Sequence, residues 1–183
     1  TSDEYLVMEA VSPVKHEYFN GEVFQMAGAS YAHNIATMNI SGNLFGKLNK
    51  SHFSVVQNDM RLFVESSGRY TYPDVMVVCG YPELKKYRGL DSLLNPVLIV
   101  EVLSPSTEDY DKGAKFDHYR TIETLSEYVL VWQDKKRVAR YTKHDDGSWN
   151  LKDFIGEDVE IDLVSVDCSL SMEDIYDKVE ISE

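Results

Sequence analysis

Two acidic residues interrupt stretches of the sequence that are otherwise almost wholly apolar. Asp74 lies within Tyr72–Val78 (Tyr-Pro-Asp-Val-Met-Val-Val), and Glu101 lies within Ile99–Leu103 (Ile-Val-Glu-Val-Leu). Short apolar runs of this kind are typical of buried strands, where a carboxylate is costly unless it is paired, protonated or bound to a metal ion. Two such carboxylates on neighbouring strands would be a poor way to stabilise a core. We therefore expect Asp74 and Glu101 to hold a divalent cation.

The length and composition of the chain predict one globular domain. The chain has 183 residues, of which 43% are hydrophobic, and this is enough to bury a core. No apolar run approaches the roughly 20 residues that a membrane span requires, and the first residues lack the segments of a signal peptide. Cys79 and Cys168 have no metal-binding spacing. We expect a single domain over residues 1–183, in the cytoplasm, with two free thiols and no membrane partner.

The net charge of −13 is unfavourable for a nucleic-acid partner, because phosphate binding depends on lysine and arginine. The charge is unevenly distributed, however. Residues 145–183 contain 13 of the 31 acidic residues and only 2 of the 18 basic ones, so residues 1–144 are close to neutral. The composition therefore argues against strong non-specific affinity for DNA, but it does not exclude a nuclease.

Apolar spacing and turn residues predict a mixed sheet flanked by helices. The expected elements are a hairpin over 16–26 around Asn20-Gly21, a helix over 30–50 capped by Ser30, strands over 53–57, 60–65, 72–78, 97–103 and 128–132, a loop or short helix over 80–96, a helix over 111–122 capped by Asp111, a second hairpin from 137–142 and 149–155, and a short helix over 172–178. The apolar run over 97–102 indicates a strand that is covered on both faces. The helix that follows it implies a parallel crossover to the next strand.

A magnesium site needs little beyond the two carboxylates. Mg²⁺ keeps several waters and is usually held by one or two carboxylates together with substrate phosphate. The bound ion can acidify a water molecule and neutralise charge on a phosphate. The reaction would also use a cation near the attacking water. Lys112 and Lys115 follow the Glu101 strand in the predicted helix, and Lys115 shares a helix face with Tyr119, four residues further on.

Several short motifs along the chain together resemble a known family. They are Glu17–Glu22, Met26–Ser30, His33-Asn34, Pro73-Asp74, Val100–Thr107, Asp111, Lys115, Tyr119 and Glu127-Tyr128. Pro73-Asp74, Glu101 and a following lysine resemble the PD-(D/E)XK nuclease superfamily, and the finer pattern resembles its Uma-two family of restriction-endonuclease-like proteins. The resemblance covers nearly the whole chain. Its most specific part is the Glu-Val-Leu-Ser-Pro-Ser-Thr segment that begins at Glu101.

The resemblance implies an α/β restriction-endonuclease-like fold, with a mixed central sheet flanked by helices, an N-terminal hairpin and a C-terminal hairpin extension. It implies an endonuclease that uses Mg²⁺ or Mn²⁺ to hydrolyse phosphodiester bonds in nucleic acid, with DNA the expected substrate. Asp74, Glu101 and the backbone carbonyl of Val102 would bind the metal, and Glu22 would support it or a second ion. Lys115 would orient the attacking water, help to deprotonate it and stabilise charge on the phosphate, while His33 would lie at the margin of the site. A homodimer is expected, because cleavage of a duplex needs two sites.

One position departs from the superfamily pattern. The pattern has a lysine two residues after the strand acid, but residue 103 is leucine. A lysine from the following helix would restore the charge at the same place in space. The resemblance assigns this role to Lys115 first and to Lys112 second.

Simpler roles remain open for these residues. Asp74 could cap a turn, Glu101 could form a structural ion pair with Lys115 or Arg120, and Glu22 could be an exposed hairpin acid. Leu103 and the acidic C-terminal region favour an alternative function, a catalytically inactive binding or interaction module with the nuclease fold. Hydrolysis of a small phosphoester is a third possibility.

Overall fold

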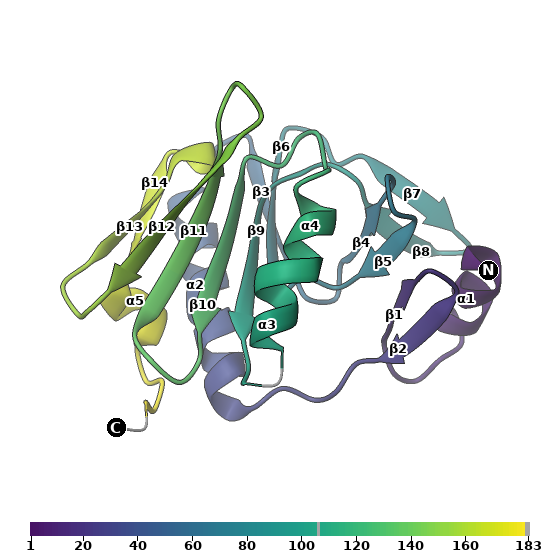
Figure 1. Ribbon diagram of the computed structural model, residues 1–183, viewed down its shortest axis with the longest axis horizontal. Helices are drawn as coiled ribbons and strands as arrows, with labels where there is room; N and C mark the ends of the chain where they lie inside the picture. Colours follow the sequence, from purple (N-terminus) through teal and green to yellow (C-terminus); the bar gives the residue numbers. More distant parts are fainter. Residues whose placement is uncertain (106, 182–183) are drawn as a thin grey trace.

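The structure is a computed structural model that describes residues 1–105 and 107–181. Its strands form two six-stranded mixed sheets and a two-stranded ribbon (Figure 1). The N-terminal sheet has the strand order β2-β1-β5-β4-β8-β7, and the central sheet has the order β12-β11-β10-β9-β6-β3. The ribbon pairs β13 with β14. Residue 106 of the Val100–Thr107 motif and residues 182–183 lie outside the described residues.

The helices and strands have the following bounds. The helices are α1 (Ser2–Glu9), α2 (Tyr31–Lys47), α3 (Glu108–Tyr110), α4 (Phe116–Tyr119) and α5 (Met172–Tyr176), with a π-helical segment at Asp111–Lys115 and a 3₁₀ turn at Val164–Val166. The strands are β1 (His16–Phe19), β2 (Glu22–Gln25), β3 (Phe53–Gln57), β4 (Arg61–Val64), β5 (Arg69–Thr71), β6 (Val75–Cys79), β7 (Leu84–Tyr87), β8 (Leu90–Leu93), β9 (Pro96–Leu103), β10 (Glu127–Trp132), β11 (Arg137–Lys143), β12 (Trp149–Ile155), β13 (Glu160–Leu163) and β14 (Cys168–Ser171).

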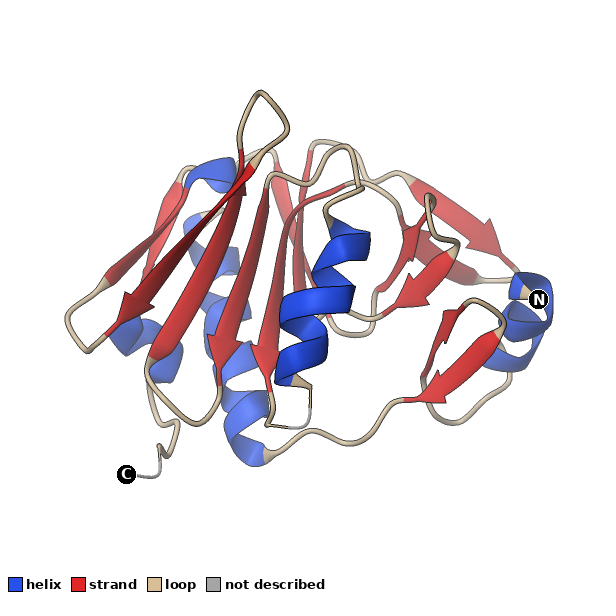
Figure 2. Cartoon of the chain, in the orientation of Figure 1, coloured by secondary structure: helices blue, strands red, loops and turns tan. Residues whose placement is uncertain are grey.

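Helices cover both faces of the central sheet, as Figure 2 shows. On one face, α2 packs on the sheet through Ala36, Ile40 and Leu44, and the ribbon and α5 extend this core. On the other face, α4 packs on the sheet through Phe116 and Tyr119. Strand β9 is therefore covered on both sides, and it runs parallel to β10. These observations confirm the predicted two-sided strand and the parallel crossover.

The hairpins follow from their turns. Phe19 and Glu22 are paired, so β1 and β2 are joined by the two residues Asn20 and Gly21, which have φ angles of 51° and 87°. Positive φ at both positions is the backbone of a type I′ turn, and Asn-Gly is its preferred sequence. The predicted N-terminal hairpin is confirmed. The predicted C-terminal hairpin is also present as β11 and β12, and it forms one edge of the central sheet.

Two predicted elements are wrong. Residues 80–96, expected to form a loop or short helix, contain the antiparallel strands β7 and β8. Arg88 and Gly89 join them with φ angles of 45° and 86°, the same two-residue geometry reached with a less typical sequence. The helical run after β9 begins at Glu108, with Thr107 at its N-terminal boundary, so Asp111 does not cap the helix. Its carboxylate instead contacts Lys115 one turn later.

None of the helices in residues 1–105 and 107–181 is long and apolar enough to cross a membrane.

Because β9 is buried on both faces, we expect substitutions on either face to destabilise the protein to a similar extent. Leu98 belongs to the core under α2 and Ile99 to the core under α4, and both side chains are fully buried. We expect Leu98→Ala and Ile99→Ala each to lower the free energy of unfolding by about 2–5 kcal/mol, since each leaves a cavity in a packed core. Urea unfolding at equilibrium measures this. A loss below about 1 kcal/mol for one of the two variants would contradict the two-sided arrangement.

Candidate active site

The two predicted metal carboxylates meet where the chain passes from the N-terminal sheet to the central sheet. Asp74 directly precedes β6, three residues after the end of β5, and Glu101 lies within β9. Strands β6 and β9 are antiparallel neighbours, with Val75 opposite Val100. The Val102 backbone N–H donates to Asp74 Oδ2 at 2.8 Å, which fixes this carboxylate beside Glu101. Asp74 therefore lies at the end of the predicted strand, and the expected neighbourhood of the two acids is present.

Lys115 reaches the same place from the helical run. Its Nζ lies 2.7 Å from Glu101 Oε1 and 3.1 Å from Asp111 Oδ1. The three side chains are buried, with Glu101 and Asp111 4% exposed and Lys115 7% exposed. Lys115 therefore contacts Glu101 directly, and Glu101 is followed by Val102, whose backbone N–H donates to Asp74. Lys112, the second candidate, instead pairs with Glu108 at 3.3 Å.

A chain of hydroxyl groups links Glu101 to the N-terminal hairpin. Tyr119 donates its phenol O–H to Glu101 Oε1 at 2.9 Å, and the Tyr119 and Thr71 hydroxyl oxygens are 3.3 Å apart. The Thr71 hydroxyl donates in turn to Glu17 on β1. This chain of contacts was not predicted. The shared helix face of Lys115 and Tyr119 was the one signal in the sequence that pointed to it.

Glu22, the hairpin acid expected to support the metal, is exposed on β2. Among the contacts of the described residues, none joins Glu22 to Asp74, Glu101 or Lys115. Glu17 is the acid of this hairpin that reaches the network, through Thr71. Glu17 and Glu22 are five positions apart in the sequence, on opposite sides of the hairpin turn. Which of the two acids contacts the network therefore depends on where the hairpin lies against β5.

His33 lies at the margin of the site, as expected. It is in the first turn of α2, where the Ser30 hydroxyl accepts from its backbone N–H at 3.1 Å and confirms Ser30 as the N-cap. His33 Nε2 is 3.3 Å from Asp74 Oδ2. Burial lowers the pKa of His33, but hydrogen bonds to Asp74 and to the Val102 backbone outweigh it and raise the pKa above its ordinary value. The imidazole therefore orients the Asp74 carboxylate.

Burial and neighbouring charges shift the pKa values of the central pair. Burial raises the pKa of the Glu101 carboxyl to about 8; the Lys115 ammonium opposes this shift, and Asp74 and Asp111 add to it. Burial alone would lower the pKa of Lys115, but Glu101, Tyr119 and Asp111 raise it well above its ordinary value. Lys115 is therefore a protonated cation in this arrangement. An ammonium at this position can stabilise negative charge.

The donor set fits a hard divalent cation. Asp74 and Glu101 offer carboxylate oxygens, and Val102 can add its backbone carbonyl. Within residues 1–105 and 107–181, no group of three or more His, Cys, Asp and Glu side chains is arranged to hold a metal ion. The set is thus too small for an all-protein cage. It matches the way Mg²⁺ is usually held, by one or two carboxylates with water and substrate phosphate completing its shell. The excess of carboxylates over cations around Glu101 also favours a bound cation.

The mixed sheets flanked by helices form a restriction-endonuclease-like α/β fold. The chain belongs to the Uma2 family, described as "Putative restriction endonuclease", which it matches over residues 2–173. It is 40% identical over 163 residues to the uncharacterized protein sll1609 of Synechocystis sp., covering 89% of this chain and 92% of that protein. It is 33% identical over 174 residues to the uncharacterized protein slr1290 of the same organism, covering 95% and 90%.

A solved structure shares the fold. It is the crystal structure of a putative nuclease belonging to DUF820 from Anabaena variabilis, with a TM-score of 0.77 and 18% sequence identity, covering 96% of this chain and 97% of that chain. The family and fold expected from the sequence motifs are confirmed.

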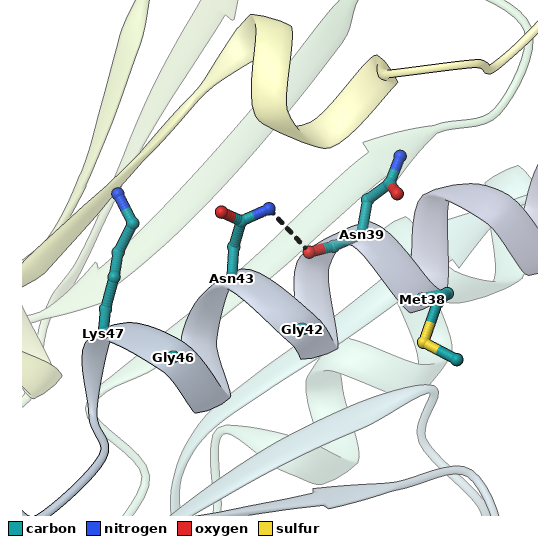
Figure 3. Close-up of a pocket in the computed structure, with 6 residues that line it drawn as sticks. All are labelled: Met38, Asn39, Gly42, Asn43, Gly46 and Lys47. Atoms are coloured by element: carbon teal, nitrogen blue, oxygen red, sulfur yellow. Dashed lines mark hydrogen bonds between the residues drawn. The ribbon is translucent and has the colours of Figure 1, made fainter.

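A surface hollow of about 370 Å³ lies elsewhere, along α2 (Figure 3). It is lined by Met38, Asn39, Gly42, Asn43, Gly46 and Lys47. Asn39 donates to the backbone carbonyls of Ile175 and Asp177, so its amide serves to hold α5 against α2. The hollow contains no carboxylate and no candidate catalytic residue. It therefore has no part in the proposed chemistry.

The Tyr119 hydroxyl should stabilise the protein through Glu101. We expect Tyr119→Phe, which keeps the buried ring, to lower the free energy of unfolding by about 1–3 kcal/mol because a buried carboxylate loses a donor. Tyr81→Phe is the matched control, since Tyr81 is 93% exposed and the change should stay within about 0.5 kcal/mol. Chemical denaturation measures both variants. Equal stability of the two would mean that the Tyr119–Glu101 hydrogen bond contributes nothing.

Proposed function

We propose that the chain is a metal-dependent endonuclease that hydrolyses phosphodiester bonds in DNA. The observation that carries this proposal is the buried contact of the Lys115 ammonium with Glu101, next to Val102, whose backbone N–H binds Asp74. Membership of a family of putative restriction endonucleases supports it. A homodimer in the cytoplasm is part of the proposal, because cleavage of both strands of a duplex needs two sites.

Each residue has a separate task in the proposed reaction. Asp74, Glu101 and the Val102 carbonyl would hold Mg²⁺ or Mn²⁺, and the bound ion would supply an acidified water molecule and neutralise charge on the phosphate. His33 holds Asp74 in place from α2. Lys115 stabilises the charge that develops on the phosphate oxygens.

We propose that the Lys115 ammonium orients the attacking water, helps to deprotonate it by stabilising hydroxide while the proton passes to solvent, and stabilises charge on the phosphate. Asp111 holds the ammonium from the second side. Glu22 stays a proposed supporting ligand, although only Glu17 of this hairpin has a contact with the network.

Removal of either carboxylate should abolish cleavage. We expect Asp74→Asn and Glu101→Gln each to reduce Mg²⁺- or Mn²⁺-dependent nicking of supercoiled plasmid DNA by about 100-fold or more, because each removes a charged group that acts on the phosphate. Asp117→Asn is the control, since Asp117 is an exposed acid on α4 whose ion pair among the described residues is with Arg120. Addition of EDTA should also stop nicking by the parent.

Two results would contradict this assignment. Full activity of the Asp74→Asn or Glu101→Gln protein would place the reaction elsewhere. Absence of nicking by the parent on DNA and RNA, with either metal, would favour the inactive binding module.

That module has a structural argument of its own. Lys115, Glu101 and Asp111 are almost fully buried and satisfy one another, as a purely structural ion cluster would. Leu103, which stands where the superfamily has lysine, is buried in the core under α4. A test that separates metal binding from catalysis can therefore decide between the two functions.

Lys115→Met provides that test. If Lys115 acts on the phosphate, the variant should lose nicking by about 100-fold or more while it still binds Mn²⁺ in a calorimetric titration. Lys112→Met is the matched control, because Lys112 is a lysine of the same helical segment that is partly exposed and pairs with Glu108. Nicking by Lys115→Met at the parent rate would remove Lys115 from the reaction. Circular dichroism verifies that both variants are folded.

A further inference from the structure

Arg69 is a buried cation that has no counter-ion among residues 1–105 and 107–181. It is 3% exposed on β5, and its Nε and Nη1 atoms are buried with no hydrogen-bond partner in the part of the chain that the structure describes. None of the ion pairs among those residues includes Arg69. A guanidinium keeps its charge at any ordinary pH, and a buried charge left unpaired is strongly destabilising. An anion bound to the Arg69 guanidinium would therefore remove this destabilisation.

The surroundings of Arg69 are aromatic. Its guanidinium carbon lies 4.5 Å from the ring centroid of Phe19 and 5.3 Å from that of Tyr110. The His118 ring packs on Phe19 at 4.6 Å, and burial together with the Arg69 charge lowers the pKa of His118. Cation–π contacts compensate part of the lost hydration, but Nε and Nη1 have no acceptor among the described residues. The aromatic rings thus hold the guanidinium in place while these two donors stay unsatisfied.

Arg69 faces the candidate active site. Successive side chains of a strand point to opposite faces, so Arg69 and Thr71 share one face of β5 and lie roughly 7 Å apart along it. Thr71 belongs to the hydroxyl chain that ends on Glu101. Tyr110, which covers Arg69, and Lys115 belong to the same helical run. The guanidinium therefore lies on the face of β5 from which Thr71 and Tyr119 lead to Glu101.

We propose that Arg69 binds a non-scissile phosphate of the nucleic-acid strand that is cleaved at Glu101 and Lys115. The inference rests on the proposed function and deepens it by assigning a second phosphate subsite. The planar fork of arginine matches two phosphate oxygens, which is why arginine is favoured for phosphate recognition. Phe19 covers Arg69 from the end of β1, and β1 is paired with β5 at the single position Tyr18–Tyr70. Because Arg69 is 3% exposed beneath Phe19, phosphate binding at this subsite requires the hairpin to move away from Arg69.

Arg61 is a matched control within the same sheet. It is 2% exposed on β4, its Nη1 and Nη2 atoms have no hydrogen-bond partner among the described residues, and it stacks on Tyr5 and Tyr70. Its Nε donates to Ser92 at 2.8 Å. Tyr70 points to the face of β5 opposite to Arg69, so Arg61 lies away from the carboxylates. If buried, stacked arginines have only a structural role, substitutions of Arg69 and Arg61 should change nucleic-acid binding to the same extent.

The test is a binding measurement without cleavage. All proteins carry Asp74→Asn and metal is chelated, and fluorescence anisotropy follows a fluorescein-labelled single-stranded oligodeoxynucleotide. We expect Arg69→Met to weaken binding about 10- to 100-fold, the usual range for loss of hydrogen bonds to a charged group, and Arg61→Met to change it less than about 3-fold. A methylphosphonate that neutralises the contacted phosphate should weaken binding to the Arg69 protein and have no further effect on Arg69→Met. Both single arginine variants should remain folded by circular dichroism.

Three results would overturn the subsite. They are equal binding by the Arg69 and Arg69→Met proteins, an equal loss in Arg61→Met, and no measurable binding by the protein with both arginines. Arg69-dependent binding of inorganic phosphate, without an effect of Arg69 on the oligonucleotide, would also overturn it and assign a free anion. Failure of the proposed function looks different: the parent would not nick plasmid DNA with any metal, while Arg69-dependent binding of the oligonucleotide would persist.

Discussion

The buried contact between Glu101 and Lys115, 2.7 Å long, is the interaction around which the site is organised. It requires β9 and the helical run to place two opposite charges together away from water. Removing two ions from water usually offsets most of their mutual attraction, so the pair is an inefficient way to stabilise a core. Asp111 and Tyr119 supply the further contacts that make its burial tolerable. The desolvation cost of this pair is explained if a metal ion and a phosphate replace part of the pairing when the site acts.

The position of the lysine has a simple geometric reason. Glu101 and Leu103 are two residues apart on β9, so both face the side of the sheet that α4 covers. A lysine at residue 103 would reach Glu101 along the strand. Lys115 reaches it from above, because the helical run lies on that same face. Leu103 can then pack in the core, and the charge required by the nuclease pattern is retained.

The sequence was sufficient to predict the helices and strands that are determined by local sequence patterns. The apolar runs predicted two neighbouring strands carrying Asp74 and Glu101, and the helix after β9 predicted both the parallel crossover and the approach of Lys115. It was not sufficient where contacts depend on how the N-terminal hairpin docks on β5. The contact of Glu17 with Thr71 and the packing of Arg69 against Phe19 both follow from this docking. The hairpin of β7 and β8 was missed because Arg88-Gly89 is not a typical turn sequence. The single domain over residues 1–183 and the roles of the site residues stay predictions.

The central claim is that this buried cluster is a metal site and not a structural ion pair. A crystal grown with Mn²⁺ and measured at the manganese absorption edge tests it most directly. The account predicts an anomalous peak within about 2.0–2.3 Å of an oxygen of Asp74, an oxygen of Glu101 and the carbonyl of Val102. Absence of such a peak, with Lys115 still held between Glu101 and Asp111 and manganese bound only elsewhere, would contradict it.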